Sequence, residues 1–445
     1  MNSLKIAVVG SGISGLSAAW LLSQRHEVTL IEAGTRIGGH SNTVQVAVPE
    51  GEVPVDAGFI VYNNKTYPNL TALFDYLSVP TAQSEMGFAV SLGRGAYEYS
   101  GAGLGGLIGH ASNLWNAGHL RMMRDLVRFF RTAHAAAQNS EHGISLGQFL
   151  RDNNYSQEFI DLHLLPMAGA IWSSAPAQML DYPAHCFLRF CENHGLLNFY
   201  DRPKWRTVEG GSVEYVQRLI ADSRMKLITG CPIHRIERSD FAASVFGADD
   251  FHQTFDQVVL ATHADQALKM LAAPSLDETE LLTPFHYSKN RAMLHSDESF
   301  MPRRKHLWSS WNYVSEKSEA GSSSVTYWMN ALQPLNTKTN IFVTLNPDRE
   351  PRSVIQEFDH MHPIFNAQTS DAQKQLWSLQ GQNRTWFCGA HFGAGFHEDG
   401  LQSGLAVAEQ LGGALRPWKV AQQNARIHVT KSHPQEKPNF VGAAV

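Results

Sequence analysis

Residues 5–39 read KIAVVGSGISGLSAAWLLSQRHEVTLIEAGTRIGG and contain two glycine clusters on either side of an acidic residue. The apolar run that opens the stretch predicts a buried parallel strand. Gly10 is expected to make the tight turn after this strand, Gly12 to let the backbone approach a pyrophosphate, and Gly15 to allow close packing of the next helix. The amides at the start of that helix would bind phosphate. The stretch therefore predicts a dinucleotide-binding unit.

The acidic residue closes the second predicted strand. Glu32 lies 17 residues after Gly15. At this spacing a carboxylate can accept both hydroxyls of an adenosine ribose but would repel a 2′-phosphate. NADP is therefore disfavoured.

The second glycine cluster distinguishes between NAD and FAD. Gly38 and Gly39 follow Arg36. Two residues without a Cβ permit close approach to an anion, and a guanidinium can bind phosphate oxygens with two parallel hydrogen bonds. The cluster resembles an extension found in the FAD-binding amine oxidase and phytoene desaturase superfamily, where it lies under the dinucleotide phosphates, and an NAD-only domain does not need it. This resemblance favours FAD. The alternative is a surface turn with a solvated arginine.

Composition narrows the function classes. A chain of 445 residues with 43% hydrophobic composition can bury the cores of two domains. The net charge of -5, with no basic block interleaved with aromatic residues, excludes a nucleic-acid-binding protein. The chain has no run of about 18 apolar residues and enters its first strand without a charged leader, which predicts a cytoplasmic protein. The four cysteines and 21 histidines lack the spacing of a disulfide framework or a metal site, and His360 and His362 are expected to be structural.

The nucleotide-binding domain is predicted to be discontinuous. Further apolar, strand-like runs with the character of a parallel sheet occur at residues 225–228, 232–236, 255–262 and 384–390, and the last is followed by a helix expected at 403–411. The prediction is an α/β fold with a discontinuous Rossmann-like FAD-binding domain and an inserted α+β substrate domain. The FAD-binding domain is expected to comprise residues 1–78, 205–268 and 380–415, the substrate domain 79–204 and 269–379, and an irregular, partly mobile tail 416–445.

The two inserts differ in pattern. Residues 80–200 are largely helical in pattern, with a glycine-rich loop expected at 93–109. Residues 324–329 and 340–345 are alternating and aromatic-rich, which favours antiparallel strands. The inserts are expected to lie over the flavin.

Residues 387–404, FCGAHFGAGFHEDGLQSG, resemble the closing FAD motif of the flavin amine oxidase and phytoene desaturase superfamily. In that superfamily the motif holds the ribityl chain and the pyrimidine edge of the flavin. Gly400 and Leu401 would place backbone amides at a helix start, where the reduced flavin gathers negative charge.

This chain departs from the superfamily at one position. Amine oxidases usually place an acid directly after the glycine that corresponds to Gly389, whereas this chain has Ala390. The ribityl contact is then expected from Glu398 or Asp399. The motifs and the resemblance together imply that FAD is bound by Gly10, Gly12, Ile13, Ser14, Gly15, Glu32, Ala33, Arg36, Gly38, Gly39, His40, Gly58, Phe59, Ile60, Ile233, Ala261, Gly389, Asp399, Gly400 and Leu401.

The resemblance extends from residue 5 to about residue 415. It is carried by the stretches DAGFIVYN (56–63), AIWS (170–173), NHGLL (193–197), WRTVEGGS (205–212), WSSWNY (308–313) and FVTLNP (342–347). These are similar to a bacterial subgroup of predicted FAD-binding oxidoreductases that includes desaturases of methyl-branched fatty acyl chains and often accompanies cyclopropane-fatty-acid-type methyltransferases. The resemblance implies hydride removal from a carbon centre to flavin N5, with oxygen or another acceptor receiving the electrons, and an apolar or lipid substrate.

The catalytic residues are not determined by the motifs. Tyr62 is a candidate wall of an apolar pocket, and it is equally compatible with ordinary core. His194 and His397 adjoin motif glycines or acids and are candidate proton acceptors, although structural histidines are the alternative. Lys289 is the lysine to test for an amine-oxidase-type role.

Residues 120–137 form a basic amphipathic pattern. Arg121, Arg124, Arg128 and Arg131 recur at spacings of 3, 4 and 3, opposite a side rich in Met and Phe. Such a helix can lie on an anionic membrane, each arginine adding about 1 kcal/mol of attraction. The alternative is a surface helix whose apolar side packs on the protein core.

Three functions remain open from the sequence. The first is an FAD-dependent oxidoreductase that desaturates a lipid acyl chain, either a methyl-branched fatty acyl group or a phospholipid. The second is a flavin amine oxidase that produces an imine and hydrogen peroxide. The third is a non-catalytic flavin-binding accessory of a lipid-modifying enzyme.

Overall fold

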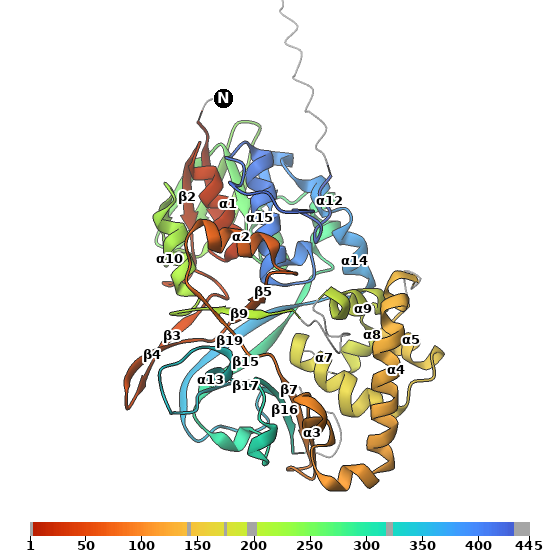
Figure 1. The fold of residues 1–445 in the computed structure, drawn as a ribbon. Coiled ribbons are helices and arrows are strands. Elements are labelled where there is room, and N and C mark those ends of the chain that lie inside the picture. Colours follow the sequence, from red (N-terminus) through yellow and green to blue (C-terminus); the bar gives the residue numbers. More distant parts are fainter. Residues whose placement is uncertain (1–2, 140–143, 173–175, 194–202, 317–323, 431–445) are drawn as a thin grey trace, which may run out of the picture.

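The computed structural model describes residues 3–139, 144–172, 176–193, 203–316 and 324–430 (Figure 1). Two large sheets organise these residues. A parallel sheet with helices α1 (Ile13–Ser23) and α15 (His397–Leu411) forms the upper part of the view in Figure 1, and a mostly antiparallel sheet forms the lower part. A group of helices from the first insert flanks the antiparallel sheet. The predicted α/β architecture is confirmed.

The parallel sheet draws its five strands from three separate stretches of the chain. Every neighbouring pair of strands is parallel. The strand order is β10 (Lys226–Ile228), β2 (Glu27–Ile31), β1 (Lys5–Val9), β14 (Gln257–Leu260) and β20 (Thr385–Phe387). Because the carboxyl ends of parallel strands share one edge, the loops after β1, β2, β14 and β20 meet there.

Helices α1 and α15 pack closely against each other. A Cβ added at Gly404 would lie 2.2 Å from the carbonyl oxygen of Ser14, so only glycine permits this approach. Helix α15 begins at His397, six residues before the expected start at residue 403. The early start has a local cause, because the Asp399 carboxylate accepts a hydrogen bond of 2.8 Å from the Phe396 amide and caps the first turn.

The larger sheet has seven strands. Neighbouring strands are antiparallel except β16 and β7, which run parallel. The strand order is β19 (Val354–Ile364), β15 (His286–His295), β18 (Phe342–Leu345), β17 (Val325–Trp328), β16 (Trp311–Ser315), β7 (Phe88–Leu92) and β8 (Tyr97–Ser100). The antiparallel strands predicted in the second insert are confirmed as β17 and β18. The second insert joins the first within this sheet through β16, which pairs with β7.

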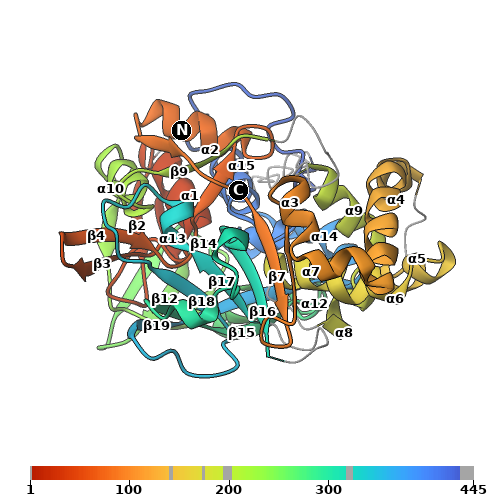
Figure 2. The same ribbon diagram turned by 60° about the horizontal axis from the view of Figure 1, so that its bottom comes forward.

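The first insert is mainly helical, as predicted, although it also supplies β7 and β8. Part of its expected glycine-rich loop is β8 and part is α3 (Gly103–Ile108). Figure 2 shows α3 and α7 beside β7, at one end of the seven-stranded sheet. The other helical segments of this insert are η1 (Ala111–Trp115), α4 (Ala117–Asn139), α5 (Leu146–Asp152), α6 (Gln157–Phe159), the π-helical turn η2 (Ile160–Leu164), α7 (Leu165–Trp172), α8 (Pro176–Asp181) and α9 (Ala184–Asn193).

Smaller elements complete the fold. The remaining strands are β3 (Thr43–Val48), β4 (Gly51–Asp56), β5 (Val61–Asn63), β6 (Thr81–Gln83), β9 (Trp205–Val208), β11 (Ile233–Arg238), β12 (Ala243–Gly247) and β13 (His252–Phe255). The remaining helices are α2 (Pro68–Tyr76), α10 (Val213–Ala221), α11 (Ala264–Met270), α12 (Leu276–Leu282), α13 (Met329–Leu332) and α14 (Ala367–Gln373). Short helical turns are η3 (Glu298–Phe300), η4 (Lys305–Leu307), η5 (Leu376–Leu379), η6 (Gln382–Arg384) and η7 (Ala390–Phe392).

The start of the expected tail is attached to the protein. Residues 416–430 lack regular structure, yet Arg416 is buried against Glu409, and Arg426 forms an ion pair with Asp399. Across the described ranges, none of the helices combines the length and the hydropathy needed to cross a bilayer.

Candidate functional site

A cavity of about 1420 Å³ lies between the parallel sheet and the seven-stranded sheet. It exceeds the roughly 300–1,000 Å³ typical of a small-molecule pocket. The residues expected to bind FAD that line it are Gly10, Gly12, Ile13, Ser14, Glu32, Ala33, Arg36, Gly39, His40, Gly58, Phe59, Ile60, Ile233, Ala261, Gly389 and Gly400. Gly15, Gly38, Asp399 and Leu401 do not line it.

The first glycine cluster shapes one wall of the cavity. Gly10 has φ +101°, and an added Cβ would lie 2.6 Å from the Ala261 carbonyl oxygen. A Cβ at Gly15 would lie 1.9 Å from the Gly10 carbonyl oxygen, so only glycine lets α1 pack this closely against the turn that follows β1. Gly15 lies on the side of this turn that faces away from the cavity. At Gly12 an added Cβ would meet no atom within 4 Å, and α1 has no side-chain cap there. The first amides of α1 are therefore available to a phosphate group.

Glu32 is held in place by the glycine loop. Its Oε2 accepts hydrogen bonds from the Ser11 amide, at 2.9 Å, and from the Ser11 hydroxyl, at 2.5 Å. Its Oε1 accepts from the Gly34 amide at 2.9 Å. The carboxylate lines the cavity with lone pairs remaining, so it can accept hydroxyl donors from a ribose.

The second glycine cluster packs directly on the first. Gly39 has φ +58°, and a Cβ there would lie 2.9 Å from the Gly12 Cα. Arg36 donates from Nη1 to the Ser41 carbonyl at 2.8 Å and from Nη2 to the Gly39 carbonyl at 2.7 Å. Burial lowers the pKa of Arg36, and the nearby Glu32 opposes that shift. The arginine thus braces the glycine loop, a role that the spacing alone did not predict, while it also lines the cavity.

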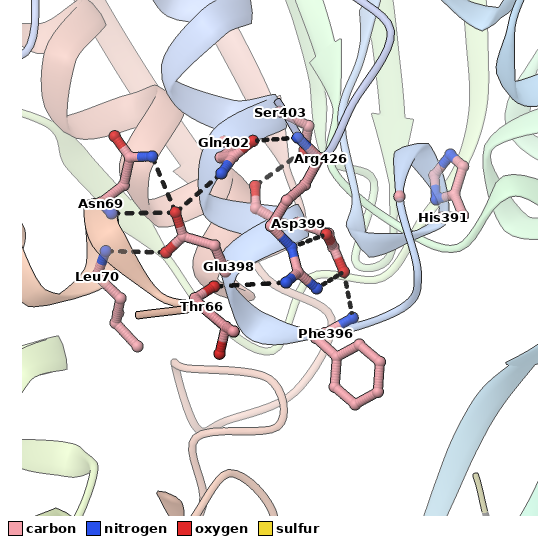
Figure 3. A network of polar contacts seen from close by, with 12 residues as sticks. Thr66, Asn69, Leu70, His391, Phe396, Glu398, Asp399, Gln402, Ser403 and Arg426 are labelled. Atoms are coloured by element: carbon pink, nitrogen blue, oxygen red, sulfur yellow. Dashed lines mark hydrogen bonds and ion pairs between the residues drawn. The ribbon is translucent and has the colours of Figure 1, made fainter. Parts of the chain in front are cut away.

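Two carboxylates of the C-terminal motif hold the fold together and do not line the cavity (Figure 3). Glu398 accepts hydrogen bonds from the amides of Asn69 and Leu70 at 3.0 and 2.9 Å. Asp399 binds the Arg426 guanidinium at 2.6 and 3.1 Å. Burial raises the pKa of Glu398, and its hydrogen bonds oppose that shift. The expectation that Glu398 or Asp399 contacts a ribityl chain is therefore corrected, because both side chains already have these buried partners.

Histidines form a cluster in the cavity wall that the sequence interpretation missed. The rings of His40 and His360 lie 5.3 Å apart, those of His40 and His362 5.7 Å apart, and those of His360 and His362 6.2 Å apart. His360 and His362 are two apart on β19, so they point to the same face of the strand. The two-residue spacing of His360 and His362 could have predicted from the sequence that they share one face of a strand. It does not predict which face of that strand lines the cavity.

The clustered histidines are neutral at pH 7. Burial, reinforced by neighbouring histidines, lowers the pKa of His362 to about 4 and the pKa of His40 well below its ordinary value. The His360 Nε2–H donates to the Ala57 carbonyl at 2.7 Å, and the Asn290 amide donates to His362 Nδ1 at 3.3 Å. No group of three His, Cys, Asp or Glu residues suited to a metal ion occurs in the described part of the chain.

Two buried histidine nitrogens in the cavity wall have no partner among the described residues. They are Nε2 of His40 and Nε2 of His391. His391 is only 4% exposed and follows Gly389, one of the motif glycines. Buried polar atoms of this kind are satisfied by a bound polar group or water. Together with the open space at Gly12, they show that this wall fits a large polar cofactor.

The candidate catalytic residues occupy different environments. His397 lines the cavity, stacks on Phe59 with ring centroids 3.9 Å apart, and lies 2.8 Å from the Tyr215 hydroxyl. Tyr62 is 2% exposed, packs against Phe74 and does not line the cavity. His194 lies outside the described residues.

Lys289 is exposed at the surface of the protein. Its Nζ forms an ion pair of 2.9 Å with Asp359, and its side chain is 65% exposed. It does not line the cavity, which corrects the expectation that it could act beside the flavin. On β15, Lys289 alternates with Asn290, which is 1% exposed, so the pleat directs the lysine outward.

The predicted basic helix is α4, and its apolar side packs on the protein. Met122, Leu126 and Phe129 are at most 3% exposed. On the other side, Arg121 pairs with Glu158, Arg124 and Arg128 pair with Asp125, and Arg131 is exposed. The Arg128 guanidinium also lies 4.0 Å from the centroid of the Tyr155 ring. This arrangement is that of a surface helix, because Met122, Leu126 and Phe129 are buried in the protein and are not available to a bilayer.

The other end of the cavity is apolar. Its lining residues there come from β7, α3, α4, α7 and β18, and none of those described carries a charge. They are Phe88, Leu107, Phe130, Met167, Ala170, Ile171, Val343 and Leu345. In Figure 1, α3, α4, α7 and β7 lie away from β2 and α1, the elements that flank the first glycine cluster and precede the second.

Short stretches of the chain are similar in sequence to curated proteins. An L-amino-acid oxidase of Pseudechis australis is 51% identical over 43 residues, 9% of this chain and 8% of that protein. A 4,4'-diapophytoene desaturase of Staphylococcus aureus is 49% identical over 43 residues, 9% of each. Over the curated relatives that it matches, the chain spans between 8% and 53% of their length.

The solved structures of similar fold include a fatty acid isomerase from P. acnes that produces CLA, with a TM-score of 0.66 and 14% identity. The match covers 91% of this chain and 97% of that one. The family model for flavin containing amine oxidoreductases matches residues 13–331, well over half of the chain. The chain therefore belongs to the flavin containing amine oxidoreductase family, whose cofactor is FAD.

Proposed function

We propose that the protein is an FAD-dependent oxidoreductase that desaturates a lipid acyl chain. One observation carries the proposal, namely that a single cavity connects the glycine-rich wall to an apolar, uncharged end. Its volume of about 1420 Å³ leaves room beside a dinucleotide for a long substrate.

The glycine-rich wall would hold the cofactor. The amides of the first turn of α1 would bind the pyrophosphate, Glu32 the adenosine ribose, and Gly400 the end of the cofactor near α15. Bound FAD supplies an acceptor for the hydride that leaves the substrate carbon, and oxygen or another acceptor later takes up the electrons.

The apolar end suits an acyl chain better than a charged amine. Each methylene that leaves water contributes about 0.8 kcal/mol of binding free energy. An ammonium group would instead lose its hydration with no described carboxylate at that end to replace it. The charged side chains among the described lining residues are Glu32, Arg36, Lys204, Lys269 and Asp359, none of which belongs to the apolar set.

Desaturation also requires an acceptor for a proton. The neutral imidazoles of His40, His360 and His362 line the cavity within 6.2 Å of one another, ring to ring. The His360 Nε2–H is engaged with Ala57, so its Nδ1 carries the lone pair. A base of this kind contributes about 10²- to 10⁴-fold, so most of the rate must come from the cofactor and from exclusion of water.

Two relatives are consistent with an apolar hydrocarbon substrate. One similar fold belongs to a fatty acid isomerase, and one short sequence match is to a diapophytoene desaturase. The first name specifies a fatty acid, and the second specifies a desaturase.

Anaerobic mixing tests the proposal. Protein loaded with FAD is mixed with a phospholipid or a fatty acyl ester, and the visible absorbance of the flavin is followed. We expect the acyl substrate to bleach the flavin and to acquire a double bond detectable by mass spectrometry. Bleaching by a polyamine or an aromatic amine alone would overturn acyl desaturation in favour of amine oxidation.

A matched pair of variants at the apolar end sharpens the test. Met167→Leu conserves volume, so we expect bleaching by the acyl substrate to be retained. Met167→Glu places an unpaired charge in the apolar end and should weaken acyl binding by at least about 100-fold, while FAD content stays unchanged. Equal behaviour of the two variants would show that this end does not bind the chain.

Amine oxidation is the second candidate because of one specific contact. Phe59 and His397 stack with an interplanar angle of 11° and line the cavity, which provides an aromatic wall for a small neutral amine. Retained FAD that no acyl or amine compound reduces, combined with stable binding to a lipid methyltransferase, would instead favour the non-catalytic accessory role.

A further inference from the structure

The π-helical turn η2 leads directly into α7 at the apolar end of the cavity. In an α-helix the carbonyl of Leu162 would accept a hydrogen bond from the amide of residue 166. That residue is Pro166, which has no amide hydrogen. Pro166 therefore rules out the α-helical hydrogen bond to the Leu162 carbonyl, and the chain makes a π-helical turn here, a feature often found at functional sites.

The hydroxyl of Tyr99 donates a hydrogen bond to this carbonyl. It lies 2.9 Å from the Leu162 carbonyl oxygen and 2.8 Å from Nδ1 of His163. A carbonyl can only accept, and a phenol has one proton, so the Tyr99 proton is used on Leu162. His163 Nδ1 must then carry a hydrogen and donate it to the Tyr99 oxygen.

This arrangement fixes the tautomer of His163. Burial lowers the pKa of His163 to about 4, so the ring is neutral at pH 7. A neutral imidazole with hydrogen on Nδ1 has a lone pair on Nε2. Nε2 makes no hydrogen bond to any residue that the structure describes, and His163 lines the cavity.

The surroundings of His163 are aromatic and uncharged. The ring stacks on Phe159, with centroids 5.9 Å apart, and meets Phe88 edge-on at 6.4 Å. The described apolar lining residues nearby, such as Phe130 and Met167, offer no donor to Nε2. A ligand that fills this end must therefore satisfy the lone pair itself.

We infer that His163 Nε2 binds the hydroxyl group of an uncharged, long-chain ligand at the apolar end of the cavity. A carboxylate has only acceptor oxygens, so it cannot donate a hydrogen bond to the lone pair of His163 Nε2. An ammonium ion would find no described anionic side chain there. The inference rests on the proposed function only in taking this cavity as the substrate site.

Binding of matched probes tests the inference. Dodecan-1-ol and dodecyl methyl ether differ in the presence of the hydroxyl donor, and their dissociation constants for the FAD-loaded protein are measured by equilibrium dialysis. We expect the alcohol to bind about tenfold more tightly than the ether, the effect of one satisfied hydrogen bond in an apolar site. Equal affinities, or tighter binding of dodecanoate or dodecylammonium, would overturn the assignment.

Two variants test whether the His163 imidazole causes the tighter binding of the alcohol. His163→Phe preserves an aromatic ring without an acceptor, so the alcohol should lose its advantage while the affinity for the ether changes less than about twofold. His163→Gln places an amide oxygen near the position of Nε2, so much of the advantage should return. An alcohol preference that persists in His163→Phe would refute the role of His163.

These measurements separate the inference from the proposed function, because they read binding and not oxidation. An alcohol preference that depends on His163 supports the inference even when no acyl compound bleaches the flavin. Bleaching by acyl lipids without any such preference would support desaturation and reject the role of His163.

Discussion

Removing the guanidinium of Arg426 should strongly destabilise the protein. Its side chain is 15% exposed and pairs with Asp399, which is fully buried, through contacts of 2.6 and 3.1 Å. Arg426→Met retains much of the apolar packing but leaves the Asp399 carboxylate buried without its counter-ion. Breaking one side of a buried ion pair costs about 3–5 kcal/mol. The corresponding change in the folding equilibrium constant is roughly 10²- to 10⁴-fold.

The measurement is the free energy of unfolding from urea titration, followed in parallel by tryptophan fluorescence and far-UV circular dichroism. The matched control is Arg94→Met, since Arg94 is 70% exposed and pairs with Glu316, which is 46% exposed. Exposed pairs contribute at most about 1 kcal/mol. The control should therefore leave stability nearly unchanged.

A double-mutant cycle with Asp399→Asn identifies the partner. The amide oxygen of Asn can still accept the hydrogen bond from Phe396, so the cap on α15 is largely retained. We expect a coupling free energy above about 1 kcal/mol between positions 399 and 426. If Arg426→Met costs no more than Arg94→Met, or if the cycle shows no coupling, the structural role of Asp399 is refuted.

Three further predictions follow from other contacts. Gly15→Ala should yield protein without FAD, seen as loss of absorbance near 450 nm, because its Cβ would lie 1.9 Å from the Gly10 carbonyl oxygen. Tyr99→Phe should lower the free energy of unfolding by about 1–3 kcal/mol by leaving the Leu162 carbonyl without its donor; an unchanged urea midpoint would contradict the assignment. His362, whose folded pKa is about 4, is protonated first in the unfolded state. Stability should therefore fall as pH decreases from about 6.5 to 4, and His362→Asn should reduce that slope by up to about 1.4 kcal/mol per pH unit in urea titrations at stepped pH.

The nucleotide-binding motif could be predicted from the sequence because its requirements are local. Gly10, Gly12 and Gly15 are needed within a single strand–turn–helix unit, and the acid follows on the next strand. The structure places Gly10 and Gly12 in the cavity wall with Glu32. Gly15 lies behind the turn, where close helix packing was expected.

The roles of charged residues could not be predicted in the same way. Asp399 was assigned to the cofactor because it follows a motif, yet its partner Arg426 is 27 residues away in an irregular segment. Lys289 was a catalytic candidate by residue type, yet the pleat of β15 and its pairing with β19 bring it to Asp359 on the surface. Such assignments depend on which face of an element is buried, and that is decided by packing.

The cluster of His40, His360 and His362 also could not be predicted from the sequence. His360 and His362 have a strand-like spacing that predicts a shared face, but their proximity to His40 arises because β19 lies beside the cavity wall. Sequence patterns report periodicity within an element and carry little information about which distant element lies opposite.

The sequence by itself determined the dinucleotide-binding unit and the α/β class, since glycine spacing and apolar runs act over a few tens of residues. The preference for FAD came from the resemblance of its motifs to those of a known superfamily. Only the tertiary structure decided that Glu398 and Asp399 have buried structural partners, that the apolar side of α4 is buried, and that His163 lines the apolar end of the cavity with its Nδ1 beside the Tyr99 hydroxyl. The physical reason is that burial and hydrogen-bond partners are set by contacts between distant segments, such as the 64 residues that separate Tyr99 from His163.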